Sequence, residues 1–173
     1  MWRLLRQIHR VGLVSEPAPM PELATVQNAL QKQIRRVFGR ALSLRHVDAG
    51  SCNGCELEIH ALSNPYYNLA GLGIRFVASP RHADALLVTG PVSQHMVEAL
   101  RRTYDATPDP KFVIAVGDCS ACGGVFGENY ATIGRVADVI PVDVTVPGCP
   151  PAPIALLRGI LSAIAAPAST PKP

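Results

Sequence analysis

The sequence predicts an α/β protein with a parallel sheet, preceded by a basic helical arm. From residue 42 onward, short runs rich in Val, Ile, Leu and Ala alternate with stretches of helical periodicity. With 173 residues, 48% hydrophobic and 17% charged, the chain can bury one full core. Cysteines follow three of the apolar runs, in turns that contain glycine or proline. We therefore expect a single α/β domain with its functional loops at the strand ends.

The first 40 residues are expected to form a basic, amphipathic helical arm. Residues 1–45 carry eight Lys or Arg against two Glu, a balance of +6, and the remainder carries −3, which together give +3. In residues 1–13 the apolar side chains fall near one helical face and the arginines elsewhere. This pattern suits a membrane surface, a groove on a partner, or the surface of another soluble domain.

A second helix is predicted after the Pro-rich linker EPAPMP. Pro21 lies near its start and Gly39 just past its end. Its apolar residues repeat at spacings of three and four: Leu23, Val26, Leu30, Ile34 and Val37. Such a stripe is typical of a core or subunit contact.

The predicted α/β domain spans residues 41–166 and is followed by a flexible tail at 167–173. The expected strands are 43–48, 73–78, 84–89, 111–116 and 142–146. The expected helices are 55–63, 93–104 and 152–165. Alternation of this kind is typical of parallel sheets with helical crossovers.

Composition and motifs exclude several classes of protein. No apolar run reaches the roughly 20 residues of a membrane-spanning helix, and the N-terminus lacks a signal-peptide core, so we expect a cytoplasmic protein. Five cysteines are an odd number for a disulfide framework. The GLG at 71–73 is no dinucleotide fingerprint, and no GK followed by Ser or Thr forms a phosphate loop. The basic arm lacks interleaved aromatic residues, so no nucleic-acid partner is expected.

Four cysteines occupy tight turns: GSCNGCE holds Cys52 and Cys55, GDCSACGG holds Cys119, and VPGCPP holds Cys149. These turns follow the first, fourth and fifth predicted strands, so all four thiols can meet at one sheet edge. Thiolates are the ligands that iron-sulfur clusters prefer, and glycines let backbone N–H groups approach the sulfurs. The turns therefore predict a cubane iron-sulfur cluster that transfers electrons.

A zinc site is the alternative, because Cys119 and Cys122 form a second CxxC. It would use Cys52, Cys55, Cys119 and Cys122. The long gap between Cys55 and Cys119 does not suit a zinc ribbon, and the alternative leaves PGCPP unexplained. The favoured role for Cys122 is a buried, inert thiol.

Four segments carry a family resemblance. They are SCNGCELEI at 51–59, SPRHADALLVTGP at 79–91, PKFVIAVGDCSACGGVF at 110–126 and IPVDVTVPGCPP at 140–151. The stretch that contains them resembles the small, cluster-bearing subunit shared by nickel-iron hydrogenases and respiratory complex I. It is most similar to the short form found in membrane-bound energy-converting hydrogenases and formate hydrogenlyases. The resemblance implies a flavodoxin-like fold and one 4Fe-4S cluster, proximal to the nickel-iron site, on Cys52, Cys55, Cys119 and Cys149.

Two departures refine the resemblance. The complex I version of the subunit places its first two cysteines side by side, whereas Asn53 and Gly54 separate Cys52 from Cys55. This spacing belongs to the hydrogenase side. No cysteine follows Cys149, so we expect the chain to hold one cubane and no relay. The alternatives are a quinone-proximal subunit of a complex I-like NADH:quinone oxidoreductase and a structural zinc protein.

The resemblance also implies partners. They are a nickel-iron large subunit, a ferredoxin-like iron-sulfur subunit and membrane-arm subunits. The chain itself would be a non-catalytic electron-transfer subunit, held peripherally on the inner side of the cell membrane.

Charged residues near the motifs give further expectations. Glu58 falls in the first turn of the helix after Cys55, where a carboxylate stabilises the helix terminus. The resemblance also implies an interface or proton-relay role for Glu58. Glu56 is expected to be a solvated neighbour, and Arg81 and Asp84 to form a loop ion pair or a subunit contact. The histidines are expected on the surface or in ordinary packing: His46, His60, His82 and His95.

Overall fold

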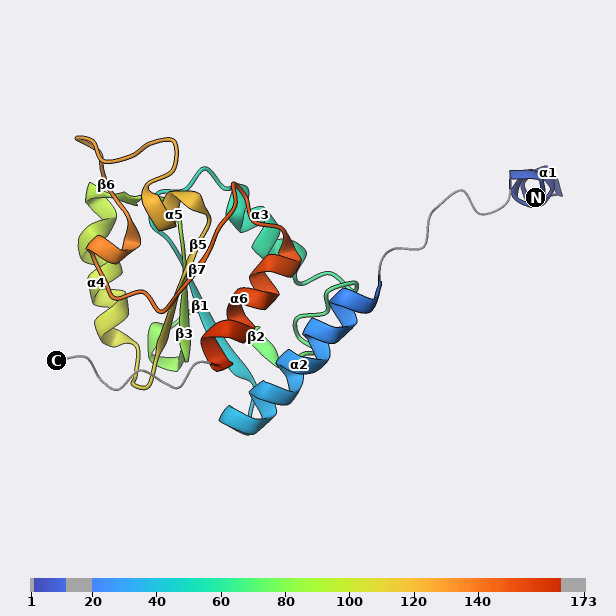
Figure 1. Cartoon of the computed structure of the whole chain (residues 1–173), viewed down its shortest axis with the longest axis horizontal. Helices are drawn as coiled ribbons and strands as arrows, with labels where there is room; N and C mark the ends of the chain where they lie inside the picture. Colours follow the sequence, from blue (N-terminus) through green and yellow to red (C-terminus); the bar gives the residue numbers. More distant parts are fainter. Residues whose placement is uncertain (1, 12–19, 166–173) are drawn as a thin grey trace.

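The computed structural model describes residues 2–11 and 20–165 (Figure 1). Most of the Pro-rich linker and the tail predicted at 167–173 lie outside these residues. Two helices form the N-terminal segment, α1 (Trp2–Val11) and α2 (Met20–Phe38). Across both described ranges, no helix is long and apolar enough to cross a membrane.

The parallel sheet is confirmed. Its strands are β1 (Leu42–Asp48), β2 (Ile74–Phe76), β3 (Ala85–Thr89), β5 (Phe112–Val116) and β7 (Val144–Val146). They lie in the order β2-β1-β3-β5-β7, and every neighbouring pair is parallel. This is the flavodoxin-like arrangement, in which the second strand pairs outside the first and the later strands add on the other side. The predicted fold class is therefore correct.

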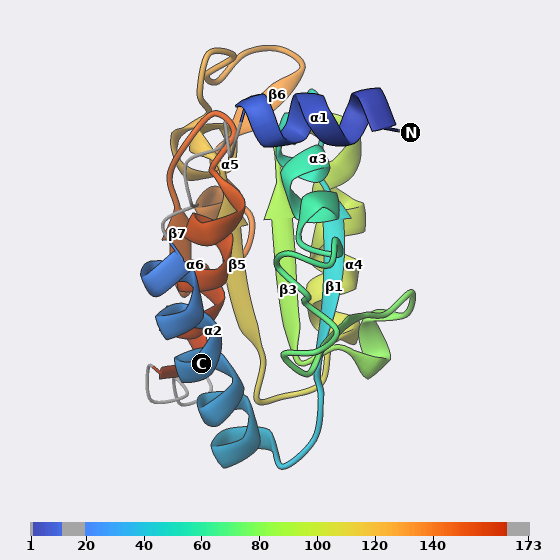
Figure 2. The same ribbon diagram turned by 90° about the vertical axis from the view of Figure 1, so that its right-hand side faces the viewer.

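Helices cover both faces of this sheet (Figures 1 and 2). On one face lie α3 (Gly54–Ala61), α6 (Pro153–Ala165) and α2, and on the other lies α4 (Val97–Ala106). Two hydrophobic clusters result, one on each face. Because parallel strands are buried on both faces, β3 and β5 read as continuous apolar runs.

Helix α2 packs against α6 and contributes to the same core as the sheet. Leu23, Leu30 and Ile34 are buried, whereas Val37, from the same predicted stripe, is 47% exposed. The helix ends before Gly39, whose φ of +62° suits a residue without a side chain. The apolar stripe therefore serves mainly as an internal contact.

Short elements in the long loops were not predicted. These are α5 (Asp118–Cys122), the antiparallel pair β4 (Val92–Ser93) and β6 (Thr132–Gly134), and three 3-10 turns at Pro80–His82, Gln94–Met96 and Val136–Asp138. None is long enough to show a period of apolar residues. The helix predicted at 93–104 begins later for the same reason, because a 3-10 turn precedes α4.

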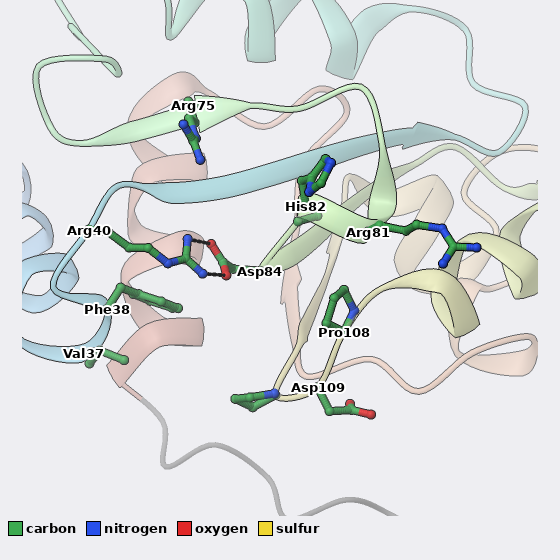
Figure 3. Close-up of a pocket in the computed structure, with 11 residues that line it drawn as sticks. Val37, Phe38, Arg40, Arg75, Arg81, His82, Asp84, Pro108 and Asp109 are labelled. Atoms are coloured by element: carbon green, nitrogen blue, oxygen red, sulfur yellow. Dashed lines mark hydrogen bonds and ion pairs between the residues drawn. The ribbon is translucent and has the colours of Figure 1, made fainter.

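The amino end of the sheet corrects one expectation. Asp84 does not pair with Arg81; its two carboxylate oxygens accept hydrogen bonds from Arg40 Nη1 at 2.9 Å and Nη2 at 2.6 Å. Figure 3 shows this fork, with Arg81 directed away from Asp84. Asp84 Oδ2 also accepts the backbone N–H of Ser43 at 2.9 Å. Arg81 was expected as the partner because it is close to Asp84 in the sequence. Arg40, which follows α2, comes near Asp84 only when the chain has folded.

Candidate metal centre

The four predicted cysteines come together at the carboxyl end of the sheet. Cys52 follows β1, Cys55 lies in the first turn of α3, Cys119 lies in α5 after β5, and Cys149 follows β7. All four line one cavity of about 140 Å³. The topology explains this convergence, because the carboxyl ends of parallel strands share one edge.

The first cysteine loop is shaped by Asp48, the last residue of β1. Its Oδ1 atom accepts the backbone N–H groups of Gly50 and Ser51, both at 2.8 Å. Burial acts to raise the pKa of Asp48, but the Ser51 and Gly50 N–H donors outweigh it and leave this pKa below its usual value. Asn53 then adopts a φ of +70° before α3 begins. The loop is thus fixed by hydrogen bonds on the strand side of Cys52.

The other two cysteine loops are tied to each other. The backbone N–H of Asp118 donates to the Gly148 carbonyl at 2.9 Å, and the Gly148 N–H donates to Asp118 Oδ1 at 2.8 Å. The N–H of Gly117 also donates to the Val146 carbonyl at 2.8 Å. Asp48 and Asp118 were not predicted as site residues, although each stands at a strand end only a few positions before a cysteine.

Two glycines allow the backbone to lie close to two of the cysteine sulfurs. A Cβ atom on Gly117 would lie 2.7 Å from Cys55 Sγ, and one on Gly124 would lie 2.7 Å from Cys119 Sγ. Both residues have positive φ, at +87° and +56°. Glycine has no Cβ atom and adopts positive φ readily, so it fits at both positions without displacing a cysteine.

Two of the four thiols, those of Cys55 and Cys119, have a raised pKa in the folded chain. Burial, followed by the charges of Glu56 and the other three cysteines, raises the pKa of Cys55 to about 12. Burial also raises the pKa of Cys119, with Cys149 and Cys52 adding to it. A bound cation favours thiolates in such a setting, since metal ligation and deprotonation are linked.

Cys122 differs from its predicted state. It is exposed, and its thiol donates to the Asp118 carbonyl at 3.2 Å. The prediction of a buried thiol is therefore wrong: Cys122 is the last residue of α5, and it is exposed there. Within residues 2–11 and 20–165, no three His, Cys, Asp or Glu side chains are grouped closely enough to hold a single metal ion, and this applies to the set with Cys122 and to the set with Cys149 alike.

The two glutamates of α3 also differ from expectation. Glu58, expected in the first turn, lies beyond it and is half-buried, and the acidic residue of the first turn is Glu56. Glu56, expected to be solvated, has a side chain only 9% exposed. Glu56 Oε1 lies 3.6 Å from His46 Nε2, which is 2.9 Å from Thr89 Oγ1. Burial lowers the pKa of His46, partly offset by the negative charge of Glu56. The alternation along β1, which aligns His46 with Leu44 and Leu42, was a signal for this inward position.

Comparison with known proteins agrees with this architecture. Residues 52–163 match the family model described as NADH ubiquinone oxidoreductase, 20 Kd subunit. The chain belongs to this family. Its resemblance to the cluster-bearing subunits, predicted from the four sequence segments, is thereby confirmed.

Individual relatives come from several complexes. The probable membrane-bound hydrogenase subunit mbhJ of Pyrococcus furiosus is 48% identical over 132 residues, which cover 76% of this chain and 79% of mbhJ. An NADH-quinone oxidoreductase subunit of Herpetosiphon aurantiacus is 48% identical over 108 residues, 62% of this chain and 60% of the relative. A chain of the membrane-bound sulfane sulfur reductase, an archaeal respiratory membrane complex, aligns with a TM-score of 0.64 at 33% identity. That alignment covers 78% of this chain and 73% of the other. The relatives place this chain among the subunits of oxidoreductase complexes.

Proposed function

We propose that this chain is the electron-transfer subunit that carries one 4Fe-4S cluster next to the nickel-iron site of a membrane-bound hydrogenase. Cys52, Cys55, Cys119 and Cys149 would hold the cluster. The observation that carries the proposal is that these four cysteines, from three strand ends, line a single cavity of about 140 Å³. A cubane takes one thiolate on each iron, so cysteines spaced around a cavity suit it better than a single ion. When bound, the cluster would take up and release single electrons.

The chain's own residues would control the surroundings of the cluster. Asp48 and Asp118 hold the loops through hydrogen bonds to backbone N–H groups. Gly117 and Gly124 bring the backbone close to Cys55 and Cys119. Such outer contacts orient the ligands and tune the potential of a metal centre.

Partners follow from the same proposal. Hydrogen chemistry would belong to a nickel-iron large subunit, and electrons would reach or leave the cubane through a ferredoxin-like subunit. Membrane-arm subunits would hold the assembly at the inner side of the cell membrane, with this chain peripheral. The names of mbhJ and of the sulfane sulfur reductase complex, both membrane-bound, support this placement. Half-buried Glu58, on the helix that carries Cys55, is our candidate for the interface or proton-relay position.

A quinone-reducing role is the second candidate. The NADH-quinone oxidoreductase relative from Herpetosiphon aurantiacus is as similar to this chain as mbhJ is, at 48% identity, although over fewer residues. The cluster would then be the last one before quinone. The two residues between Cys52 and Cys55 favour the hydrogenase.

Two measurements test the proposal. The full chain, purified without oxygen, should contain iron and acid-labile sulfide in equal amounts and give an EPR signal after reduction. Diamagnetic protein that contains only zinc would end the cluster proposal. Hydrogen evolution and NADH:quinone activity, measured on the purified complex, decide between the two candidates. Two CxxC pairs in the large subunit would agree with a nickel-iron site.

A further inference from the structure

A second pocket lies beside α3, apart from the cysteine cavity. It encloses about 410 Å³, and its walls include Arg45, His46, Glu56 and Phe76. It lies where the sheet becomes incomplete: β2 ends at Phe76, opposite Leu44, whereas β1 continues to Asp48. On the other side, β1 stays paired with β3 as far as Asp48.

Three buried polar atoms at this pocket lack hydrogen-bond partners within the described ranges. They are both carboxylate oxygens of Glu56 and the Nε atom of Arg45. His46 does not supply the missing donor, because its Nε2 atom is 3.6 Å from Glu56 and 2.9 Å from Thr89 Oγ1. A buried carboxylate without donors is unfavourable, so the donors are expected from another molecule.

We propose that a partner subunit inserts a basic side chain into this pocket and that this side chain forms an ion pair with Glu56. A guanidinium group carries paired N–H donors in one plane, which match the two free oxygens. The Nε–H group of Arg45 would donate a hydrogen bond to a backbone carbonyl of the same inserted segment. The inference rests on the proposed function only in that the chain works as one subunit of a complex.

Several features favour a protein over a small cation. Phe76, in the pocket wall, is 39% exposed, and Leu57, next to Glu56 on α3, is 62% exposed. Exposed apolar side chains near a buried charged group are typical of an interface. The open edge of β1 also offers main-chain groups to an extended segment. Since Glu56 is adjacent to Cys55, the partner would dock beside the cysteine cavity.

The direct test is a cryo-electron microscopy structure of the assembled wild-type complex. We expect an Arg or Lys side chain of a partner within ion-pair distance of the Glu56 carboxylate. The inference is overturned if Glu56 contacts only water, if an apolar side chain fills the pocket, or if Arg45 turns inward and pairs with Glu56 itself.

A variant series gives an independent readout. In the purified complex, Glu56→Gln should dissociate from its partners at least about tenfold faster than wild type, because the partner's charge is left unpaired. Glu128→Gln, at an exposed position in another loop, is the matched control and should dissociate at the wild-type rate. An unchanged rate for Glu56→Gln counts against the inference.

Iron and EPR analysis of the same samples separates this inference from the proposed function. An intact cluster with an unpaired Glu56 overturns the inference alone. A zinc-only protein with a paired Glu56 overturns the cluster alone.

Discussion

Asp118 and Gly148 exchange two hydrogen bonds, one between their backbones at 2.9 Å and one from the Gly148 N–H to Asp118 Oδ1 at 2.8 Å. This pair joins the Cys119 loop to the Cys149 loop. Asp118→Ala should lower the free energy of unfolding by about 1–3 kcal/mol, because the Gly148 N–H loses its acceptor. It should also lower the iron content of the purified chain.

Asp118→Asn keeps an oxygen at the same position and should recover part of both losses in urea unfolding and iron analysis. Asp105→Ala, at an exposed site on α4, is the control for a lost aspartate. Equal losses in the Ala and Asn variants would mean that charge, not this hydrogen bond, matters.

The cysteines should separate into two groups. Serine at position 52, 55, 119 or 149 should reduce iron and sulfide strongly and remove the wild-type EPR signal, because a ligand is lost. Cys122→Ser should keep both, since Cys122 is exposed and bonds only to a backbone carbonyl among the contacts described for it. Loss of the cluster in Cys122→Ser, with retention in Cys149→Ser, would mean that Cys122 is the ligand and Cys149 is not.

Gly124 and Gly127 form a matched pair. Their φ angles are +56° and +59°, so alanine at either position costs about 1–2 kcal/mol of backbone strain. A Cβ on Gly127 meets nothing within 4 Å, whereas one on Gly124 would lie 2.7 Å from Cys119 Sγ. Gly124→Ala should therefore lose iron as well as stability, and Gly127→Ala only stability. Iron analysis and urea unfolding of both variants would reveal the difference, and equal iron content would contradict it.

The fork between Arg40 and Asp84 joins the end of α2 to the amino end of the sheet. The Arg40 side chain is 56% exposed and that of Asp84 11% exposed. Arg40→Ala should cost about 1 kcal/mol, because solvent screens the pair, and Asp84→Ala about 2–3 kcal/mol, because the Ser43 N–H also loses its acceptor. Chemical unfolding measures both, with Arg102→Ala as the control, since Arg102 pairs with Glu98 on the surface of α4. A larger loss for Arg40→Ala than for Asp84→Ala would reverse this ranking.

His46 should make folding stability depend on pH. Burial lowers its pKa in the folded state below the usual 6.5, so the unfolded chain binds a proton first as the pH falls. Stability should therefore decrease below about pH 6.5, by at most about 1.4 kcal/mol per pH unit, until the folded-state pKa is reached. His46→Asn should flatten this dependence in unfolding experiments between about pH 7.5 and 5.5. An unchanged slope in His46→Asn would refute the assignment.

The sequence allowed the five strands of the parallel sheet, their pairing and the convergence of the cysteine loops to be predicted. β3 and β5 are continuous apolar runs, and the turn after β5 carries Gly117 close to Cys119. These signals are local, and the parallel topology then places the loops at one edge.

Features that depend on contacts between distant segments could not be read in this way. Arg40 reaches Asp84 only after α2 has packed beside the sheet. Glu56 is buried because the helix after Cys55 lies over the inward-facing His46 of β1, whereas its position in an acidic helical turn suggested solvent. Cys122 repeats the CxxC spacing, yet it lies exposed at the end of α5.

The position of β7 has a consequence for biosynthesis. β7 is an edge strand of the sheet and, among the described residues, the last strand in sequence order, and Cys149 follows it. During translation, Cys149 emerges from the ribosome later than the other three cysteines of the cavity, which are Cys52, Cys55 and Cys119. The four thiols come together only after β7 has paired with β5, so a machinery that loads metal would have to act after the Cys149 loop has been made.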